Sequence, residues 1–130
     1  MFSGIIENFG TIISIDSEKK GLSLILAITP PRELDIGTSI AINGACLTLA
    51  NIKDSNHFFF ISSETIDKTS FRYLKKGHNV NVEYPLTLNK FISGHITTGH
   101  IDGIAEILSF SQIDKAWELL INIPSQVTKY

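Results

Sequence analysis

Short runs of strand-forming residues, separated by turn residues, extend through most of this 130-residue chain. The clearest turn is Asn43-Gly44, which lies between the segments SIAI and ACLTLANI. Both residues tolerate the positive φ that a two-residue hairpin requires, and a second hairpin turn is expected at residues 53–56. Hairpin-linked strands hide their edges when the sheet closes on itself. We therefore predict an all-β fold, a closed six-stranded Greek-key barrel with one or two short helices.

The segments with strand character are residues 5–15, 22–28, 39–42, 46–52, 57–61, 79–84, 101–108 and 118–123. Gly4 and Gly10 flank or interrupt the first segment and are candidate bulge positions. One short helix is expected over Ser63–Leu74, with Ser63 as its cap and three apolar residues facing inward: Ile66, Phe71 and Leu74. The chain has the length of one domain, and no internal repeat or linker is evident.

Charge and composition exclude several classes of function. A formal net charge of −2 and a pI near 6.0, without a Lys/Arg cluster, argue against nucleic-acid binding. The single cysteine, Cys46, rules out an internal disulfide and a structural zinc site. The amino-terminal residues lack a leader pattern, and no apolar run approaches the ~20 residues that span a bilayer. The sequence predicts a soluble, cytoplasmic protein that binds neither nucleic acid nor membrane.

The segment SGHITTGH places His95 and His100 five residues apart. Residues at that spacing point to opposite faces of a strand, so a shared metal ion is disfavoured unless a bulge at Gly99 reverses the phase. The glycines lack the spacing and the lysine of a phosphate loop. They are instead expected to let the backbone bend around a flat ligand.

Cys46 allows two interpretations. It can act as a nucleophile paired with a histidine, or it can be a small buried hydrophobic residue. In a strand it shares a face with Thr48, whereas Leu47 and Leu49 occupy the core face. This arrangement predicts a polar rim on the barrel. Taken alone, SSET, residues 62–65, is better explained as a helix cap.

Four segments together resemble the amino-terminal lumazine-binding barrel of riboflavin synthase. They are MFSGIIE (1–7), SIAINGACLTL (39–49), SSETIDKTSF (62–71) and SGHITTGHIDG (93–103). Members of that family carry two tandem barrels and a carboxy-terminal helix, and they assemble as homotrimers. The active site lies between the first barrel of one protomer and the second barrel of its neighbour. The resemblance implies a lumazine-binding barrel over residues 1–123 and the start of a connector to a second barrel at 124–130.

The reaction implied by the resemblance joins two molecules of 6,7-dimethyl-8-ribityllumazine. A four-carbon unit passes from one to the other, which gives riboflavin and 5-amino-6-ribitylamino-pyrimidinedione without a metal or an organic cofactor. One lumazine loses a proton from its C7 methyl group, and a nucleophile adds at C7 of the other. Holding two flat rings face to face supplies much of the rate through effective molarity.

The resemblance also implies roles for individual residues. The residues expected to take part in catalysis are Ser39, Cys46 and His100. Those expected to bind substrate are Gly4, Ile5, Ile6, Cys46, Leu47, Thr48, Ser62, Ser63, Glu64, Thr65, Gly99, His100 and Ile101. No metal ligand is implied. The nucleophile, Cys46 or a water molecule, stays open at this point.

Two further hypotheses stand beside the enzyme. The barrel can be a non-catalytic module that binds lumazine or riboflavin, or it can be a structural remnant. In either functional case a homo-oligomer is expected, a trimer for a full-length protein and a dimer for a single barrel.

Overall fold

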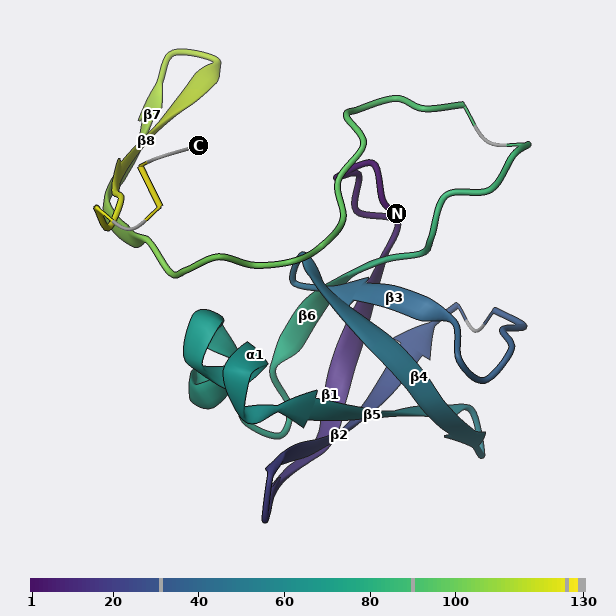
Figure 1. Cartoon of the computed structure of the whole chain (residues 1–130). Coiled ribbons are helices and arrows are strands. Elements are labelled where there is room, and N and C mark those ends of the chain that lie inside the picture. The colour runs from purple at the N-terminus through teal and green to yellow at the C-terminus, as the bar shows by residue number, and fades with distance from the viewer. Residues whose placement is uncertain (31, 90, 126, 129–130) are drawn as a thin grey trace.

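Six antiparallel strands close into a barrel, in a computed structural model that describes residues 1–30, 32–89, 91–125 and 127–128. The order around the barrel is β1-β2-β5-β4-β3-β6, and β6-β3-β4-β5 forms a Greek key (Figure 1). The bounds are β1 Asn8–Glu18, β2 Gly21–Thr29, β3 Ser39–Ile42, β4 Ala45–Lys53, β5 Asn56–Ser62 and β6 Asn79–Glu83. The predicted fold class is confirmed.

Both predicted hairpin turns are present. Asn43 and Gly44 join β3 to β4 with φ angles of 49° and 84°, and Asp54 and Ser55 join β4 to β5 with φ angles of 51° and 65°. Positive φ at both central residues matches the right-handed twist of the paired strands. These two turns fix the register of β3, β4 and β5.

The barrel interior is filled by alternate residues of its strands. Along β4, Leu47 and Leu49 are buried, whereas Cys46 and Thr48 face outward, as the alternation predicts. Phe71 adds a fully buried ring from outside the sheet. A buried side chain of this size contributes about 1.5–3 kcal/mol relative to an exposed one. The core therefore fixes which side chains are left on the outer surface of β4.

The first strand differs from the prediction. It begins at Asn8 instead of residue 5, and its bulge lies between Ile12 and Ser14 instead of at Gly10. Gly10 stays in register, where an added Cβ would lie 3.3 Å from the side chains of Val80 and Val82. The residues before β1 leave the sheet because they are hydrogen-bonded to Glu83, a contact between distant parts of the sequence.

The predicted single helix is two short elements, α1 (Ser63–Lys68) and the 3₁₀ helix η1 (Ser70–Tyr73). They are separated by Thr69, which has extended φ and ψ, and the cap is Ser62 instead of Ser63. As expected, Phe71 is buried, and Ile66 and Leu74 pack against the core. No helix among the residues that the structure describes is long and apolar enough to cross a membrane.

Strands β7 (Glu106–Ile113) and β8 (Ala116–Asn122) form a separate two-stranded sheet, drawn apart from the barrel in Figure 1. The strand prediction for residues 101–105 was therefore wrong, because these residues form an irregular segment. The boundary predicted at residue 123 stays a prediction. Residues 126, 129 and 130 of the predicted connector lie outside the described residues.

Hairpin β7–β8 repeats hairpin β1–β2. Adding 95 to the residue numbers of the paired residues Ile12 and Leu26 gives the paired residues Ile107 and Ile121. In each hairpin a bulge directly follows the first residue of this pair. The sequence prediction that no repeat is present was thus wrong. The core residues of β1 and β2 have apolar counterparts in the second hairpin that are exposed: Ile107, Leu119, Ile121 and Ile123. The second hairpin carries the apolar pattern of a barrel core without a core to bury it.

Candidate functional site

The outward face of β4 forms one wall of the site. Cys46 is half-buried, and Thr48 beside it is exposed. The amide of Cys46 does not pair within the barrel sheet; it donates to the carbonyl oxygen of Gly99 at 2.8 Å. This bond places the segment around residues 99–102 against the outside of the barrel.

Gly99 is required by the close approach of this segment. Its φ is +77°, and an added Cβ would lie 2.9 Å from the Cβ of Cys46 and 3.2 Å from the ring of Phe2. A side chain here would meet both a strained backbone and occupied space. Gly99 thus allows a close approach to Cys46 and Phe2, whereas the predicted bend of the backbone around a flat ligand stays a prediction.

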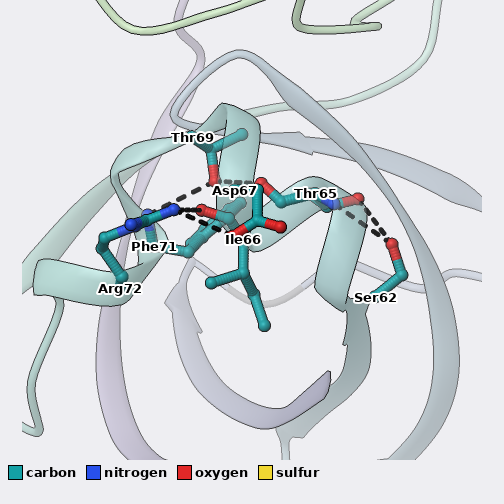
Figure 2. Close-up of polar contacts among 7 residues, drawn as sticks. All are labelled: Ser62, Thr65, Ile66, Asp67, Thr69, Phe71 and Arg72. Carbon is teal, nitrogen blue, oxygen red and sulfur yellow. Dashed lines mark hydrogen bonds and ion pairs between the residues drawn. The ribbon is translucent and has the colours of Figure 1, made fainter. Parts of the chain in front are cut away.

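Helix α1 forms the second wall, and a local hydrogen-bond network fixes its position (Figure 2). The Ser62 hydroxyl accepts from the Thr65 amide at 3.2 Å and lies 3.0 Å from the Thr65 hydroxyl. At the other end, the Thr69 hydroxyl donates to the Thr65 carbonyl at 2.6 Å. Arg72 donates to Asp67 at 3.0 Å and ties η1 to α1. Both ends of α1 are therefore bonded, and Glu64, Thr65 and Lys68 line a cavity together with Cys46 of β4.

Two adjoining cavities lie between these walls, with volumes of about 410 and 330 Å³, and they share Cys46 and Thr65. We call their union the recess. Its other lining residues are Ala45, Leu47, Thr48, Ala50, Phe60, Ser62, Glu64, Lys68, Gly99, His100, Ile101 and Asp102. Small-molecule sites have volumes of about 300–1,000 Å³, so the recess has the size of a ligand site.

The recess is charged at one end. Lys68 donates to Glu64 at 2.8 Å, one helical turn away. This hydrogen bond and the charge of Lys68 lower the pKa of Glu64, whereas Glu64, with a smaller contribution from Asp102, raises the pKa of Lys68. Both side chains are therefore charged at neutral pH and offer donors and acceptors to the hydroxyls and ring edges of a polar ligand.

The structure brings together most of the predicted site residues but leaves five outside the lining of the recess: Gly4, Ile5, Ile6, Ser39 and Ser63. Ser39 pairs directly with Thr48 and lies one strand away. Ser63 is the first residue of α1 and is exposed. Leu47 reaches the recess while its side chain belongs to the core, so it offers mainly backbone.

Sequence reasoning missed Lys68 and Asp102, which both line the recess. Lys68 could have been found from its spacing of four residues from Glu64 in a predicted helix. Asp102 follows two predicted site residues, but nothing in its sequence context marks it. Among the residues that the structure describes, no three His, Cys, Asp or Glu side chains gather to hold a metal ion.

The profile of the lumazine binding domain matches residues 3–85, which include all six strands of the barrel. The chain belongs to the lumazine-binding domain family. The match ends two residues after β6 and does not reach the Gly99 side of the recess. The recess lies between the outer surface of the matched barrel and the segment at residues 99–102.

Curated relatives of this lumazine-binding domain include riboflavin synthases. The protein of Photobacterium phosphoreum is 36% identical over 134 residues, which cover 100% of this chain and 61% of the relative. That of Bacillus amyloliquefaciens is 36% identical over 132 residues, covering 99% and 60%. That of Chlamydia pneumoniae is 38% identical over 109 residues, covering 82% and 54%. The chain thus spans about 60% of the length of the first two relatives.

Solved structures of LumP have the same fold as this lumazine-binding domain. LumP complexed with riboflavin superposes with a TM-score of 0.86 at 26% identity, covering 98% of this chain and 70% of LumP. LumP complexed with 6,7-dimethyl-8-(1'-D-ribityl) lumazine gives a TM-score of 0.86 at 26% identity, covering 96% and 70%. The predicted membership of the lumazine-binding family is therefore confirmed.

Proposed function

We propose that this chain is the amino-terminal, lumazine-binding half of a riboflavin synthase. The observation that carries the proposal is the recess, where β4, α1 and the 99–102 segment meet although they are distant in sequence. Three of the four segments that resemble riboflavin synthase contribute its walls. The matching relatives, which carry that name, support the same reaction.

The recess suits one 6,7-dimethyl-8-ribityllumazine. The flat ring would lie in the cavities beside the Cys46 side chain, with residues 99–101 along its edge, and the polar groups of α1 would bind the ring edge or the ribityl chain. Backbone amides and carbonyls outside regular strands, as at residues 99–101, can hydrogen-bond to the alternating donors and acceptors on the edge of a pyrimidinedione ring. Donors aimed at the ring oxygens would stabilise the anion formed when the C7 methyl group loses its proton. The second lumazine would lie face to face with the first, on the open side.

Ser39, Cys46 and His100 are proposed to act in the chemistry. Cys46 lines both cavities and His100 lines one of them, whereas Ser39 lies outside the lining and is paired with Thr48. Either the Cys46 thiol or a water molecule beside it adds at C7 of the acceptor lumazine. Activity of Cys46→Ala close to wild type would identify water, and a loss of about a hundredfold with unchanged binding would identify the thiol.

A fluorescence titration tests the binding step. Adding this chain to riboflavin should quench flavin fluorescence with a Kd of about micromolar. Thr48→Trp fills the recess and should abolish quenching. Thr11→Trp, on the exposed face of β1, is the matched control and should bind normally. Failure of the wild-type chain to bind either riboflavin or the lumazine would refute the proposal.

A non-catalytic binding module is the second candidate. It is favoured by the similarity to LumP, whose solved structures hold riboflavin or the lumazine. Incubating the chain with 6,7-dimethyl-8-ribityllumazine separates the candidates. Riboflavin production supports the synthase. Because the active site implied by the resemblance is shared between two barrels, tight binding without riboflavin production supports the module only if a protein that carries both barrels is also inactive.

We also propose that hairpin β7–β8 opens a second barrel, which would move the domain boundary to a point before β7. The shared register, bulge and apolar pattern of the two hairpins support this. A protein with both barrels would form the homotrimer proposed for the family, and a single barrel would form a dimer. The proposed location is the cytoplasm, where a free cysteine such as Cys46 stays reduced.

A further inference from the structure

Glu83, the last residue of β6, is a buried carboxylate whose hydrogen-bond partners are in the amino-terminal segment. Only 4% of the residue is exposed. It accepts from the Ser3 amide at 2.6 Å, from the Ser3 hydroxyl at 2.9 Å and from the Gly4 amide at 3.1 Å. These donors are neutral, and no ion pair to Glu83 is present among the residues that the structure describes.

A buried carboxylate destabilises a fold unless several donors meet it, and three donors from two adjacent residues do so here. Gly4 makes this possible because its φ of +81° turns two successive amides toward one acceptor. Gly4 has open space around it, so its backbone conformation is the reason for a glycine. We call the contact of Ser3 and Gly4 with Glu83 the clamp.

The clamp is connected to the recess through Phe2. The Phe2 amide donates to the Thr97 carbonyl at 2.8 Å, and the Thr97 amide donates to the Phe2 carbonyl at 2.9 Å. Phe2 is 1% exposed, and its ring lies against Gly99. Gly94 packs on the backbone of Ser3 so closely that no side chain would fit. The amino-terminal segment therefore supports the segment that forms one wall of the recess.

We infer that Glu83 is a positioning residue for the ligand site. It has no place in the lining of the recess, yet it anchors Ser3 and Gly4, which place Phe2 under Gly99 and hold that segment on Cys46. Its loss would leave the barrel closed and the 94–101 segment free to move. Apparent affinity falls in proportion to the fraction of molecules in the competent conformation. The inference rests on the proposed lumazine site for its binding readout.

Two variants test the clamp. Glu83→Gln keeps the volume but replaces one acceptor oxygen by a donor that faces the Gly4 amide. It should weaken riboflavin binding about tenfold, the loss expected when charge-assisted hydrogen bonds become neutral ones. Ser3→Ala removes only the hydroxyl donor and should weaken binding by about threefold. The matched control is Val80→Ala, which opens a cavity on the same strand without touching the amino-terminal segment.

The variants are compared by fluorescence titration, thermal unfolding and hydrogen exchange. The control should lose melting temperature while its Kd stays within about twofold of wild type. In Glu83→Gln, amide exchange should accelerate in peptides covering residues 1–6 and 94–101 and stay slow in the core of β4. Equal Kd and exchange in wild type and Glu83→Gln would overturn the inference, as would a Kd that merely follows melting temperature across all variants.

Hydrogen exchange also distinguishes a failure of this inference from a failure of the proposed function. If the wild-type chain binds neither riboflavin nor the lumazine, the proposed function fails. Faster exchange confined to residues 1–6 and 94–101 of Glu83→Gln would still support the clamp, and unchanged exchange would refute it.

Discussion

The amide of Cys46 donates a 2.8 Å hydrogen bond to the carbonyl of Gly99, and this bond joins the barrel wall to the segment that covers it. Cys46 lies in β4, whereas Gly99 lies after the barrel is complete. The recess exists because these two backbones meet. Substitutions that separate them should therefore affect ligand binding more than they affect the barrel.

Gly99→Ala should reduce affinity for riboflavin by tenfold or more, because the new Cβ would lie 2.9 Å from the Cβ of Cys46. The positive φ adds a backbone cost of about 1–2 kcal/mol. Gly77→Ala is the matched control, since Gly77 has a φ of +85° and open space around it. The control should lose similar stability without losing affinity. Equal affinity of both variants in a fluorescence titration would contradict this account of the recess.

Ser62→Ala should destabilise the protein by about 1 kcal/mol, because the Thr65 amide loses its capping acceptor. It should also weaken riboflavin binding, since Thr65 lines both cavities. Ser63→Ala is the control, and its effect on stability should stay within about 0.5 kcal/mol. Chemical denaturation of the two variants decides the point. A larger loss of stability from Ser63→Ala than from Ser62→Ala would show that Ser63, the cap predicted from the sequence, caps the helix in place of Ser62.

His57 should make stability depend on pH. It is 1% exposed, neither ring nitrogen has a hydrogen bond of ordinary geometry, and burial lowers its pKa, an effect that the backbone of Leu26 partly offsets. The unfolded chain therefore binds the proton more readily than the folded one. This contribution to stability is complete above the ordinary histidine pKa of about 6.5 and is lost as the pH falls toward the lowered value.

The test is His57→Leu, which fills a similar volume without a titratable group. Its melting temperature should fall less between about pH 7 and about pH 5 than that of wild type. His78→Gln, at an exposed position, should keep the wild-type dependence. Parallel curves for wild type and His57→Leu would show that the buried imidazole is not the source of the acid sensitivity.

Ile121→Lys should weaken self-association of this chain about tenfold or more, because Ile121 takes the place of the core residue Leu26 in the repeated hairpin and is 41% exposed. Ser111→Lys, whose counterpart Asp16 is exposed on β1, is the control. Sedimentation velocity over a range of concentrations measures the effect. A wild-type chain that stays monomeric at high concentration would refute the proposed dimer.

Local features made much of the fold predictable. The Asn43-Gly44 turn and the alternation of Cys46 and Thr48 with Leu47 and Leu49 depend only on neighbouring residues, so sequence reasoning placed them correctly. The start of β1 could not be found in this way. Ile5 and Ile6 have strand character, but the bonds from Ser3 and Gly4 to Glu83 draw the chain out of the sheet.

The repeated hairpin escaped detection for a related reason. Its two copies share register, bulge and apolar positions, whereas most of the polar residues between these positions differ. A pattern of apolar residues is common to most strands, so it identifies a repeat only when the pairing partners are known. The site was predictable in part. The motifs pointed to Cys46, Thr65 and Gly99, but Asp102 lines the recess only because the 99–102 segment folds back onto β4.

The burial of Phe2 has a practical consequence for handling this protein. Met1 is exposed, and the next residue is already bonded to Thr97 and packed against the wall of the recess. An affinity tag fused ahead of Met1 would emerge beside the site whose binding is to be measured. Tags for purification and dyes for fluorescence are better attached at the carboxy-terminal side, beyond β8, and any amino-terminal fusion should be cleaved before a titration is interpreted.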